Sequence, residues 1–455
     1  MGPSGGSIND EHAGKNMRAR SFRAVKLAAP ISLVAALAAI CASVTPAFAA
    51  TSEINAADTA FMIVATALVL MMTIPGLALF YSGMVRKKNV LATMAQSLAA
   101  VAIISVLWVA FGYSLSFVGD GPWLGNLHRA FLAGMTMDSV NPAAKTIPEA
   151  LFMLYQMTFA IITVALVAGS VADRMRFSAY LLFSITWFIF VYVPLAHWVW
   201  GGGFLGSMGV LDFAGGLVVH LSAGVGGLVA AKVLGKRQGY GVENLSPFDL
   251  SLAVIGTGLL WVGWFGFNGG SALTASPRAV MAITATHLAA SSGALVWGGI
   301  EWWSRKKPSV LGMISGAVAG LGTITPASGF VAPWQGIIIG AIAGGVCYWA
   351  CTWLKHRFAY DDSLDVFGVH GIGGLTGTFL CGVFATASIG GTPGLLEGHS
   401  QQVLIQLYGI AVTLVWSAGV TYALLKLVGI FVPLRVSKEQ ELEGLDITQH
   451  GEALQ

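Results

Sequence analysis

Two histidines in apolar surroundings are the residues of this chain best suited to chemistry. His220 lies within the run 212–237, DFAGGLVVHLSAGVGGLVAAKVLGKR, which is otherwise almost entirely apolar or small. His370 lies in a similar run that begins at Asp365, DVFGVHGIGGLTG. Each run has an acid followed by a glycine-rich apolar stretch with one embedded histidine. A neutral imidazole has one hydrogen-bond donor and one acceptor, so such a side chain can bind a small polar molecule or relay a proton.

The first of these runs has the length of a membrane-spanning helix. About 20 residues at a rise of 1.5 Å each cross the hydrocarbon core of a bilayer. Its glycines form helices poorly in water, but in lipid they allow helices to pack closely. An ionisable side chain inside such a segment indicates function by default. The plainer alternative is a core histidine hydrogen-bonded across helices, and two histidines in matching settings favour the functional interpretation.

The composition indicates a polytopic membrane protein. Of 455 residues, 56% are hydrophobic and only 10% are charged, against about 25% charged in a typical soluble domain. The net charge of +3 and the lack of a basic cluster interleaved with aromatics argue against nucleic-acid binding. No phosphate-binding loop or dinucleotide fingerprint is present, which excludes an ATP-driven pump and predicts no cofactor. The four cysteines lack ligand spacing, so neither a disulfide nor a metal site is expected.

Residues 1–49 are predicted to be a signal peptide with a disordered or misassigned start. Arginines and a lysine between positions 18 and 26 precede an apolar core at 27–42, and Ala47-Phe48-Ala49 is a small-x-small cleavage site. Cleavage would leave a mature N-terminus near Ala50, outside the cytoplasm.

Eleven apolar spans are predicted after this segment. They are 57–82, 90–118, 147–171, 177–199, 212–234, 249–269, 278–303, 309–329, 334–354, 364–385 and 402–432. Loops predicted to be cytoplasmic carry Arg86-Lys87-Lys88, Arg174 with Arg176, Lys236-Arg237, Arg305-Lys306-Lys307, and Lys355 with Arg357. Loops predicted to be external carry only Arg129, Lys145 and Arg278. The positive-inside rule therefore supports an external N-terminus and a cytoplasmic C-terminus in a multi-pass protein of the bacterial cytoplasmic (inner) membrane.

The eleven spans divide naturally into five plus five, related by inversion, plus one. The two histidine-bearing runs are then the fifth and tenth spans, each closing its half. This arrangement predicts that both histidines lie near the pseudo-two-fold axis at the middle of the bilayer, where inverted-repeat transporters bind substrate. The expected fold is all-α, with a transmembrane domain over residues 50–432 and a cytoplasmic tail over 433–455.

Aromatic residues gather near the predicted external ends of several spans. Trp198 and Trp200 precede three glycines, Tyr155 and Phe159 lie four residues apart on the third span, and the sixth span ends GWFGFNGGS at Ser271. An aromatic belt at the membrane interface explains part of this pattern. Trp200 fits a vestibule better, because the three glycines behind it suit a close-packed turn. An aromatic face there can attract a cation by about 0.5–2 kcal/mol.

Several motifs together resemble the ammonium transporter (Amt/MEP/Rh) family. The run 212–237 is similar to its signature over the whole length. Further similarities are Thr73-Ile74-Pro75-Gly76, Phe80-Tyr81-Ser82-Gly83, the Gly263–Asn268 segment, Thr325-Pro326-Ala327, the Asp361–Gly371 segment, and Gly-Leu-Asp and His-Gly-Glu in the tail. The resemblance covers residues 57–452.

This resemblance implies a role for particular positions. Trp200, Phe159 and Ser271 would recruit ammonium at the external mouth, with Asp212 supporting the site without touching substrate. Phe159 with Tyr155 would form a stacked gate, although family members of bacterial type carry Phe where this chain has Tyr155. The gate and pore would further include Phe267, Trp264, His220 and His370, the paired histidines forming a proton relay.

The function implied is uptake of ammonium, which is deprotonated below the mouth and conducted as ammonia past the twin histidines. A separately relayed proton would make transport electrogenic. The resemblance also implies a homotrimer in the lipid bilayer and a tail that docks on the cytoplasmic face and couples to a PII-type signalling protein. The chain would not be an enzyme. A haem or quinone enzyme, an ammonium sensor of the same fold and an Rh-type gas channel are the alternatives.

Overall fold

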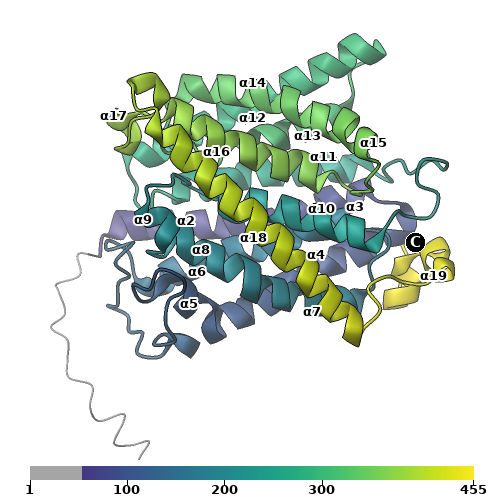
Figure 1. Ribbon diagram of the computed structural model, residues 1–455, viewed down its shortest axis with the longest axis horizontal. Coiled ribbons are helices and arrows are strands. Elements are labelled where there is room, and N and C mark those ends of the chain that lie inside the picture. The colour runs from purple at the N-terminus through teal and green to yellow at the C-terminus, as the bar shows by residue number, and fades with distance from the viewer. Residues whose placement is uncertain (1–53, 455) are drawn as a thin grey trace, which may run out of the picture. The chain divides into compact units, whose positions relative to one another are not determined.

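The computed structural model describes residues 54–454, and every regular element in that range is a helix (Figure 1). The predicted signal peptide, residues 1–49, lies outside the described residues. The main helices are α2 (Ala56–Met71), α3 (Ala78–Met84), α4 (Val90–Leu107), α5 (Tyr113–Phe117), α6 (Glu149–Val171), α7 (Phe177–Trp187), α8 (Val193–Trp200), α9 (Phe204–Ser207), α10 (Ser222–Leu234), α11 (Leu250–Trp264), α12 (Pro277–Arg305), α13 (Val310–Ile324), α14 (Pro333–Trp349), α15 (Lys355–Phe358), α16 (Ile372–Phe384), α17 (Ala387–Gly390), α18 (Gln401–Phe431) and α19 (Lys438–Glu443).

Wider π-helical turns connect or extend many of these helices. They are η1 (Met72–Leu77), η3 (Trp108–Gly112), η5 (Phe188–Tyr192), η6 (Gly216–Leu221), η7 (Phe265–Gly269), η8 (Ala350–Leu354), η9 (Phe367–Gly371) and η11 (Asp446–His450). Both histidines of the sequence analysis lie in such turns, His220 in η6 and His370 in η9. Short π-helical turns occur frequently at functional sites.

Ten helical stretches of the described chain are long and apolar enough to cross a membrane. They match ten of the eleven predicted spans, with ends that differ by a few residues. The predicted span 309–329 instead contains the 15-residue helix α13, which is about 22 Å long and shorter than the ~30 Å hydrocarbon core. The residues after it turn back toward α14, so this segment is shorter than expected as a helix.

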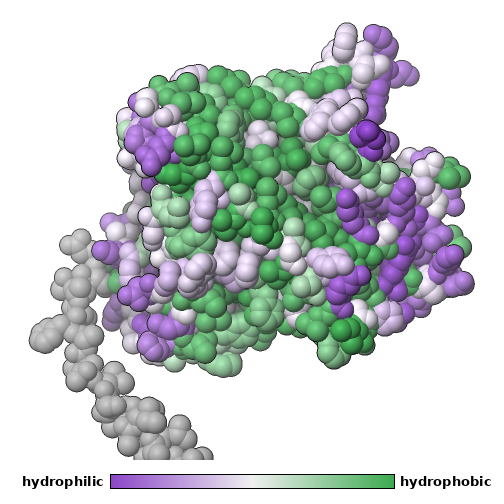
Figure 2. Space-filling view, viewed as in Figure 1, coloured by the Kyte–Doolittle hydropathy of each residue, from purple (hydrophilic) through white to green (hydrophobic). Residues whose placement is uncertain are grey.

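The surface of the helical bundle is apolar where a membrane would surround it. Figure 2 shows hydrophobic residues across the middle of the visible face and hydrophilic residues gathered toward its two ends. Large apolar side chains such as Val106, Leu295, Val415 and Ile430 are 69–77% exposed in the bare chain. An apolar surface of this kind is stable when lipid covers it.

The helices begin at residues that suit a helix start. The Asn55 side chain accepts hydrogen bonds from the Ala57 and Asp58 N–H groups at the start of α2, and Asp249 does the same for α11. Ser276 precedes Pro277 and accepts from the Ala279 N–H group at the start of α12. Such caps satisfy N–H groups that have no partner within the helix.

The predicted fifth and tenth spans begin later than expected. The helical backbone starts at Gly216 instead of residue 212, and the second histidine segment turns helical near Phe367 instead of residue 364. Gly215 has φ +118°, a conformation that glycine tolerates and that separates Asp212 from the helix. The acid in front of the first histidine is thus a cap outside the helix instead of a residue within it.

Glycines allow the two histidine segments to cross in direct backbone contact. A Cβ atom added to Gly224 would lie 2.2 Å from the Gly371 nitrogen, and one added to Gly374 would lie 2.5 Å from the Gly216 carbonyl oxygen. Any larger residue would push the segments apart. Close helix packing through small residues is typical of membrane bundles, and here it brings the histidines together.

Candidate functional site

The two histidines meet in the centre of the bundle. The Nδ1 atoms of His220 and His370 lie 3.2 Å apart, and the two rings are nearly parallel, with centroids separated by 5.2 Å. Both side chains are buried. The distance allows one Nδ1 to donate and the other to accept, so the rings share a proton between them. The sequence predicted this pairing from the matched settings of the two residues.

A narrow apolar cavity of about 10 Å³ adjoins the pair. That volume holds the centre of about one water-sized molecule. The polar side chains among its lining residues are His220, His370 and Trp264; the others include Leu77, Phe80 and Val318. Trp264 stacks on His220 with centroids 5.5 Å apart, and its Nε1 donates to Thr325 Oγ1. A single small neutral molecule fits this environment far better than a hydrated ion.

Two stacked phenylalanines lie next to His220, and one of them, Phe267, lines the cavity. The rings of Phe159 and Phe267 lie 4.2 Å apart with an angle of 19° between them, and both are almost completely buried. Phe159 also meets the Trp200 ring edge to face at 5.9 Å. Trp200, the stacked phenylalanines and the histidines therefore follow one another in a continuous series.

Tyr155 does not stack with Phe159, which corrects the predicted composition of the stacked gate. The two rings meet at 62°, and the ring that stacks on Phe159 is Phe267. The Tyr155 hydroxyl instead donates to the carbonyl oxygens of Gly266 and Phe267, at 3.0 and 2.9 Å. The hydroxyl that distinguishes Tyr from Phe thus binds the turn that carries Phe267 and holds that turn from outside the stack.

The residues predicted to form the mouth lie around Trp200. Its indole Nε1 donates to the backbone carbonyl of Asp212 at 2.8 Å. Ser271 follows η7, and its Oγ donates to the Phe267 carbonyl at 2.8 Å and lies 3.3 Å from the Tyr155 hydroxyl. Trp200 and Ser271 are partly exposed while Phe159 beneath them is buried. These contacts connect both exposed residues to the stacked pair.

Asp212 organises the start of the helix that carries His220. Its Oδ1 accepts from the Gly215 and Gly216 N–H groups at 2.7 and 2.6 Å, and its Oδ2 accepts from Leu217 and Val218 at 2.8 and 3.2 Å. Four N–H groups that have no partner within the helix are thereby satisfied. The carboxylate faces the helix and the carbonyl accepts from Trp200, so Asp212 holds the Trp200 indole through its backbone.

Asp362 is a site residue that the sequence analysis missed. It lies eight residues before His370, the same spacing that separates Asp212 from His220, and its Oδ2 accepts from the Phe367 N–H group at 2.7 Å. Asp365, which the sequence analysis paired with Asp212, instead forms an ion pair with Lys355 at 2.6 Å. The equal spacing was visible in the sequence and would have identified Asp362.

A larger cavity, the tail-side cavity, lies beyond His370. Its volume is about 490 Å³, and its lining includes His370, Tyr81, Glu301, Lys355 and Asp365. His370 lines this cavity and the narrow one, whereas His220 lines only the narrow one. The cavity lining therefore changes at His370 from largely apolar to partly charged side chains.

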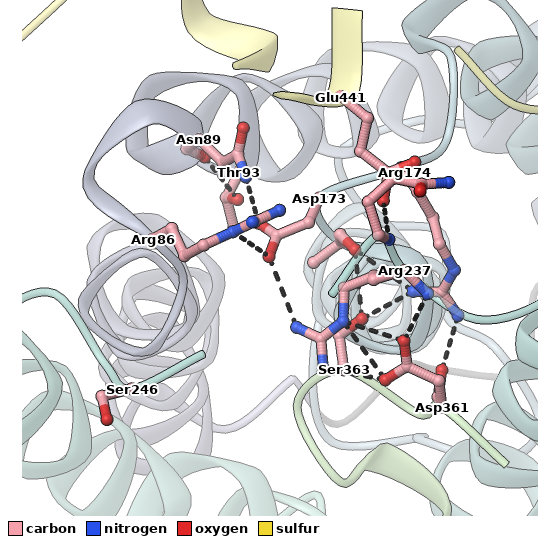
Figure 3. Close-up of polar contacts among 12 residues, drawn as sticks. Arg86, Asn89, Thr93, Asp173, Arg174, Arg237, Ser246, Asp361, Ser363 and Glu441 are labelled. Carbon is pink, nitrogen blue, oxygen red and sulfur yellow. Dashed lines mark hydrogen bonds and ion pairs between the residues drawn. The ribbon is translucent and has the colours of Figure 1, made fainter. Parts of the chain in front are cut away.

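Buried ion pairs join residues that follow α3, α6 and α10 to each other and to Asp361 beside this cavity (Figure 3). Arg237 bonds Asp361 at 2.8 Å and Asp173 at 3.3 Å, and Arg86 also reaches Asp173 at 3.3 Å. Burial by itself would raise the pKa of Asp361, but the hydrogen bonds and positive charge of Arg237 outweigh it and hold that pKa below its usual value. The Arg174 guanidinium joins the same cluster, because it donates to the backbone carbonyl oxygen of Asp361 at 2.5 Å.

The C-terminal tail docks against these ion pairs. Glu441 of α19 is fully buried, accepting from the Arg435 guanidinium at 2.7 and 3.1 Å and from the Gln238 N–H group at 2.7 Å. The Leu445 N–H group donates to Asn89, and Asp446 accepts from the Ala92 N–H group. The tail therefore contacts the start of α4 and the loop after α10.

Comparison with known proteins identifies relatives along almost the whole described chain. The family model described as Ammonium Transporter Family matches residues 60–454. An "Ammonium transporter" of Bacillus subtilis is 51% identical over 397 residues, which cover 87% of this chain and 97% of the relative. One of Aquifex aeolicus is 48% identical, covering 89% of this chain and 95% of the relative.

Solved structures agree with this assignment. The crystal structure of Saccharomyces cerevisiae Mep2 has a TM-score of 0.79 and 37% identity, covering 86% of this chain and 89% of that one. A structure titled "Sensor Amt Protein" has a TM-score of 0.79 at 27% identity, covering 87% and 98%. The family model, the relatives and the shared fold together show that this chain is a multi-pass membrane protein that belongs to the ammonium transporter family.

Proposed function

We propose that this protein takes up ammonium by recruiting NH4+ at Trp200, Phe159 and Ser271, deprotonating it, and conducting NH3 past His220 and His370. A separately relayed proton then accompanies each ammonia and makes transport electrogenic. The observation that carries the proposal is the histidine pair, with Nδ1 atoms 3.2 Å apart, beside an apolar cavity of about 10 Å³.

The energetics favour ammonia over ammonium in that cavity. Moving an unpaired cation into a low-dielectric interior costs several kcal/mol even after relaxation, while each cation–π contact at the mouth contributes only about 0.5–2 kcal/mol. The narrow cavity contains no carboxylate among its lining residues. Neutral ammonia, by contrast, can exchange hydrogen bonds with either imidazole, and the shared Nδ1 contact offers the proton a separate path.

The proposed setting is the inner membrane of a bacterium. Eleven spans, with α13 as the eighth, place the N-terminus outside and the tail in the cytoplasm, after removal of the signal peptide 1–49. Residues 50–432 form the transmembrane domain as five plus five inverted spans plus one, and the protein assembles as a homotrimer with one pore in each subunit. The equal spacing of Asp212–His220 and Asp362–His370 supports the repeat.

The tail, residues 433–455, is proposed to be regulatory and to couple transport to a PII-type protein. Support comes from its buried contacts: Glu441 and Leu445 reach the loop after α10 and the start of α4, beside the tail-side cavity. A protein that bound the tail would change contacts close to the exit of the pathway.

Electrophysiology on solid-supported membranes tests the mechanism. Proteoliposomes receive jumps of ammonium, methylammonium and potassium, and the expected wild-type result is a current with ammonium but not with potassium. His220→Leu and His370→Leu should each abolish the ammonium current or strongly alter its selectivity. His287→Leu changes an exposed histidine outside the pathway and should retain the current. Unchanged current and selectivity in both pore variants would contradict the relay.

A further inference from the structure

Two buried polar atoms of α12 have no hydrogen-bond partner in the described chain. They are the acceptor Oε2 of Glu301 and the donor Nε1 of Trp297. Both side chains are only 5% exposed, and both line the tail-side cavity. The residues lie four positions apart, so they occupy the same face of the helix, one above the other. Neither residue is part of the pathway from Trp200 to His370 described above.

The surroundings of Glu301 neutralise its charge only weakly. Its single ion pair joins Oε1 to Arg305 Nη2 at 3.4 Å, and the Arg305 side chain is 60% exposed. Exposed pairs of this kind contribute little, whereas a buried carboxylate without a partner is costly. The two other carboxylates that line the cavity differ, because Asp365 has a close pair with Lys355 and Glu243 is exposed to solvent.

The chain makes room for this carboxylate with a glycine on the neighbouring helix. A Cβ atom added to Gly312 of α13 would lie 2.0 Å from Glu301 Oε2 and 3.1 Å from Trp297 Cδ1. Any other residue at position 312 would displace the carboxylate from its place beside the indole. The Trp297 ring is fixed from the opposite side by an edge-on contact with Tyr348 of α14, at 5.6 Å.

We propose that Glu301 and Trp297 form a second substrate site, an exit site, that holds ammonia or ammonium in the tail-side cavity after it has passed the histidines. Ammonia satisfies both atoms, because its lone pair accepts from the indole N–H while its own N–H donates to the carboxylate. Ammonium has no lone pair, so it keeps only the bond to Glu301. Binding involves no covalent change. Protonation of the bound ammonia removes the contact to the indole N–H group and makes the bond to Glu301 charge-assisted.

This inference rests on the proposed function and predicts an asymmetry between the two sides of the membrane. Ammonium applied at the mouth meets Trp200 first, whereas ammonium applied at the tail side meets Glu301 first. Loss of the exit site should raise the half-saturating ammonium concentration for tail-side application about tenfold, equivalent to ~1.4 kcal/mol. The corresponding value for application at the mouth should shift by a much smaller factor.

The test measures ammonium-evoked currents in right-side-out and inside-out membrane vesicles that contain the full chain. Glu301→Gln keeps the shape of the side chain and removes its charge, Trp297→Phe removes the N–H group, and Gly312→Ala displaces the carboxylate without changing any charge. Glu301→Gln and Gly312→Ala should raise the tail-side half-saturating concentration at every pH. Trp297→Phe should raise it too, by a factor that grows with pH, because only ammonia accepts from the indole N–H group. Glu243→Gln makes the same chemical change as Glu301→Gln at an exposed carboxylate of the same cavity, and should not raise it.

The outcomes separate the exit site from the proposed function. Wild-type current from the mouth side supports the proposed function whatever the variants do, and its absence would refute that function. If Glu301→Gln shifts both sides equally or neither side, the exit site is wrong. If Trp297→Phe has no effect, the two-atom site is wrong. Unfolding transitions of the purified variants show whether any loss of current arises from misfolding. If Gly312→Ala does not fold, Glu301→Gln and Trp297→Phe alone decide whether the exit site exists.

Discussion

Replacement of the two capping aspartates by asparagine should have unequal effects on stability. Asp212 and Asp362 occupy matching positions, each eight residues before a pore histidine. The Asp212 carboxylate accepts four backbone N–H groups, two on each oxygen. The Asp362 carboxylate accepts one, from Phe367. The same substitution at the two positions therefore removes different numbers of hydrogen bonds and provides an internal control.

The magnitudes follow from these contacts. In Asp212→Asn the amide oxygen can still accept two N–H groups, but the amide nitrogen then faces the other two donors. Hydrogen bonds to a charged group contribute about 1.5–3 kcal/mol each, so we expect a loss of about 3–5 kcal/mol in the free energy of unfolding. In Asp362→Asn the amide can turn its oxygen toward Phe367 and keep the bond, so we expect a loss of only about 1–2 kcal/mol.

The assay is equilibrium unfolding of purified protein in mixed micelles, followed by ammonium currents from the same preparations. Because Trp200 Nε1 donates to the Asp212 carbonyl, a displaced Asp212 also displaces the mouth, and its variant should lose more current than the Asp362 variant. Two results would contradict this account of the caps. One is an unfolding free energy of Asp212→Asn within about 1 kcal/mol of wild type, and the other is a larger loss in Asp362→Asn than in Asp212→Asn.

Three further predictions follow from single contacts. Tyr155→Phe removes the hydrogen bonds to the Gly266 and Phe267 carbonyls, so unfolding free energy should fall by about 1–2 kcal/mol, while the ammonium current stays within about tenfold of wild type because the phenylalanine stack remains. Glu441→Gln should release the tail and speed its proteolysis in detergent relative to Glu439→Gln, which changes an exposed neighbour; equal rates would contradict buried docking. Asp361 has a lowered pKa in the folded state, so its contribution to stability is present above its unfolded pKa of about 3.9 and is lost as pH falls through the lower folded value. Unfolding free energy should therefore decline below about pH 4, and Asp361→Asn should remove part of that decline.

Span positions could be predicted because apolar runs and charged loops are properties of the chain alone. The bounds of α18, predicted at 402–432 and found at Gln401–Phe431, depend only on where hydrophobicity begins and ends. The length of α13 was harder to predict from the sequence. Its predicted run continues to residue 329, but its helix ends at Ile324. Averaged hydropathy does not report where a chain stops being helical, because a short buried turn such as 325–329 lies within the same window as the apolar helix before it.

The sequence predicted the contact that follows from two similar segments. It did not predict the contact that depends on how a side chain is oriented. The pairing of His220 with His370 followed from their matched settings. The identity of the ring that stacks on Phe159 did not, because Tyr155 lies four residues away on the same helix while Phe267 comes from a distant turn. Only the fold shows that the Tyr155 hydroxyl turns toward the backbone of that turn. Asp362 could have been recognised from its spacing, which is eight residues before His370, as Asp212 is before His220.

The contrast between the two cavities explains why the histidines lie where they do. From Trp200 to His370 the passage is closed by stacked rings and narrows to about 10 Å³; beyond His370 it widens to about 490 Å³ lined by charged groups. In the proposed mechanism, substrate loses its hydration only over the short apolar passage, where His220 and His370 offer hydrogen bonds. A relay placed in the wider cavity would compete with water for the proton. In the mechanism proposed above, the shared Nδ1 contact at the narrowest point carries the proton beside the ammonia, away from the wider cavity.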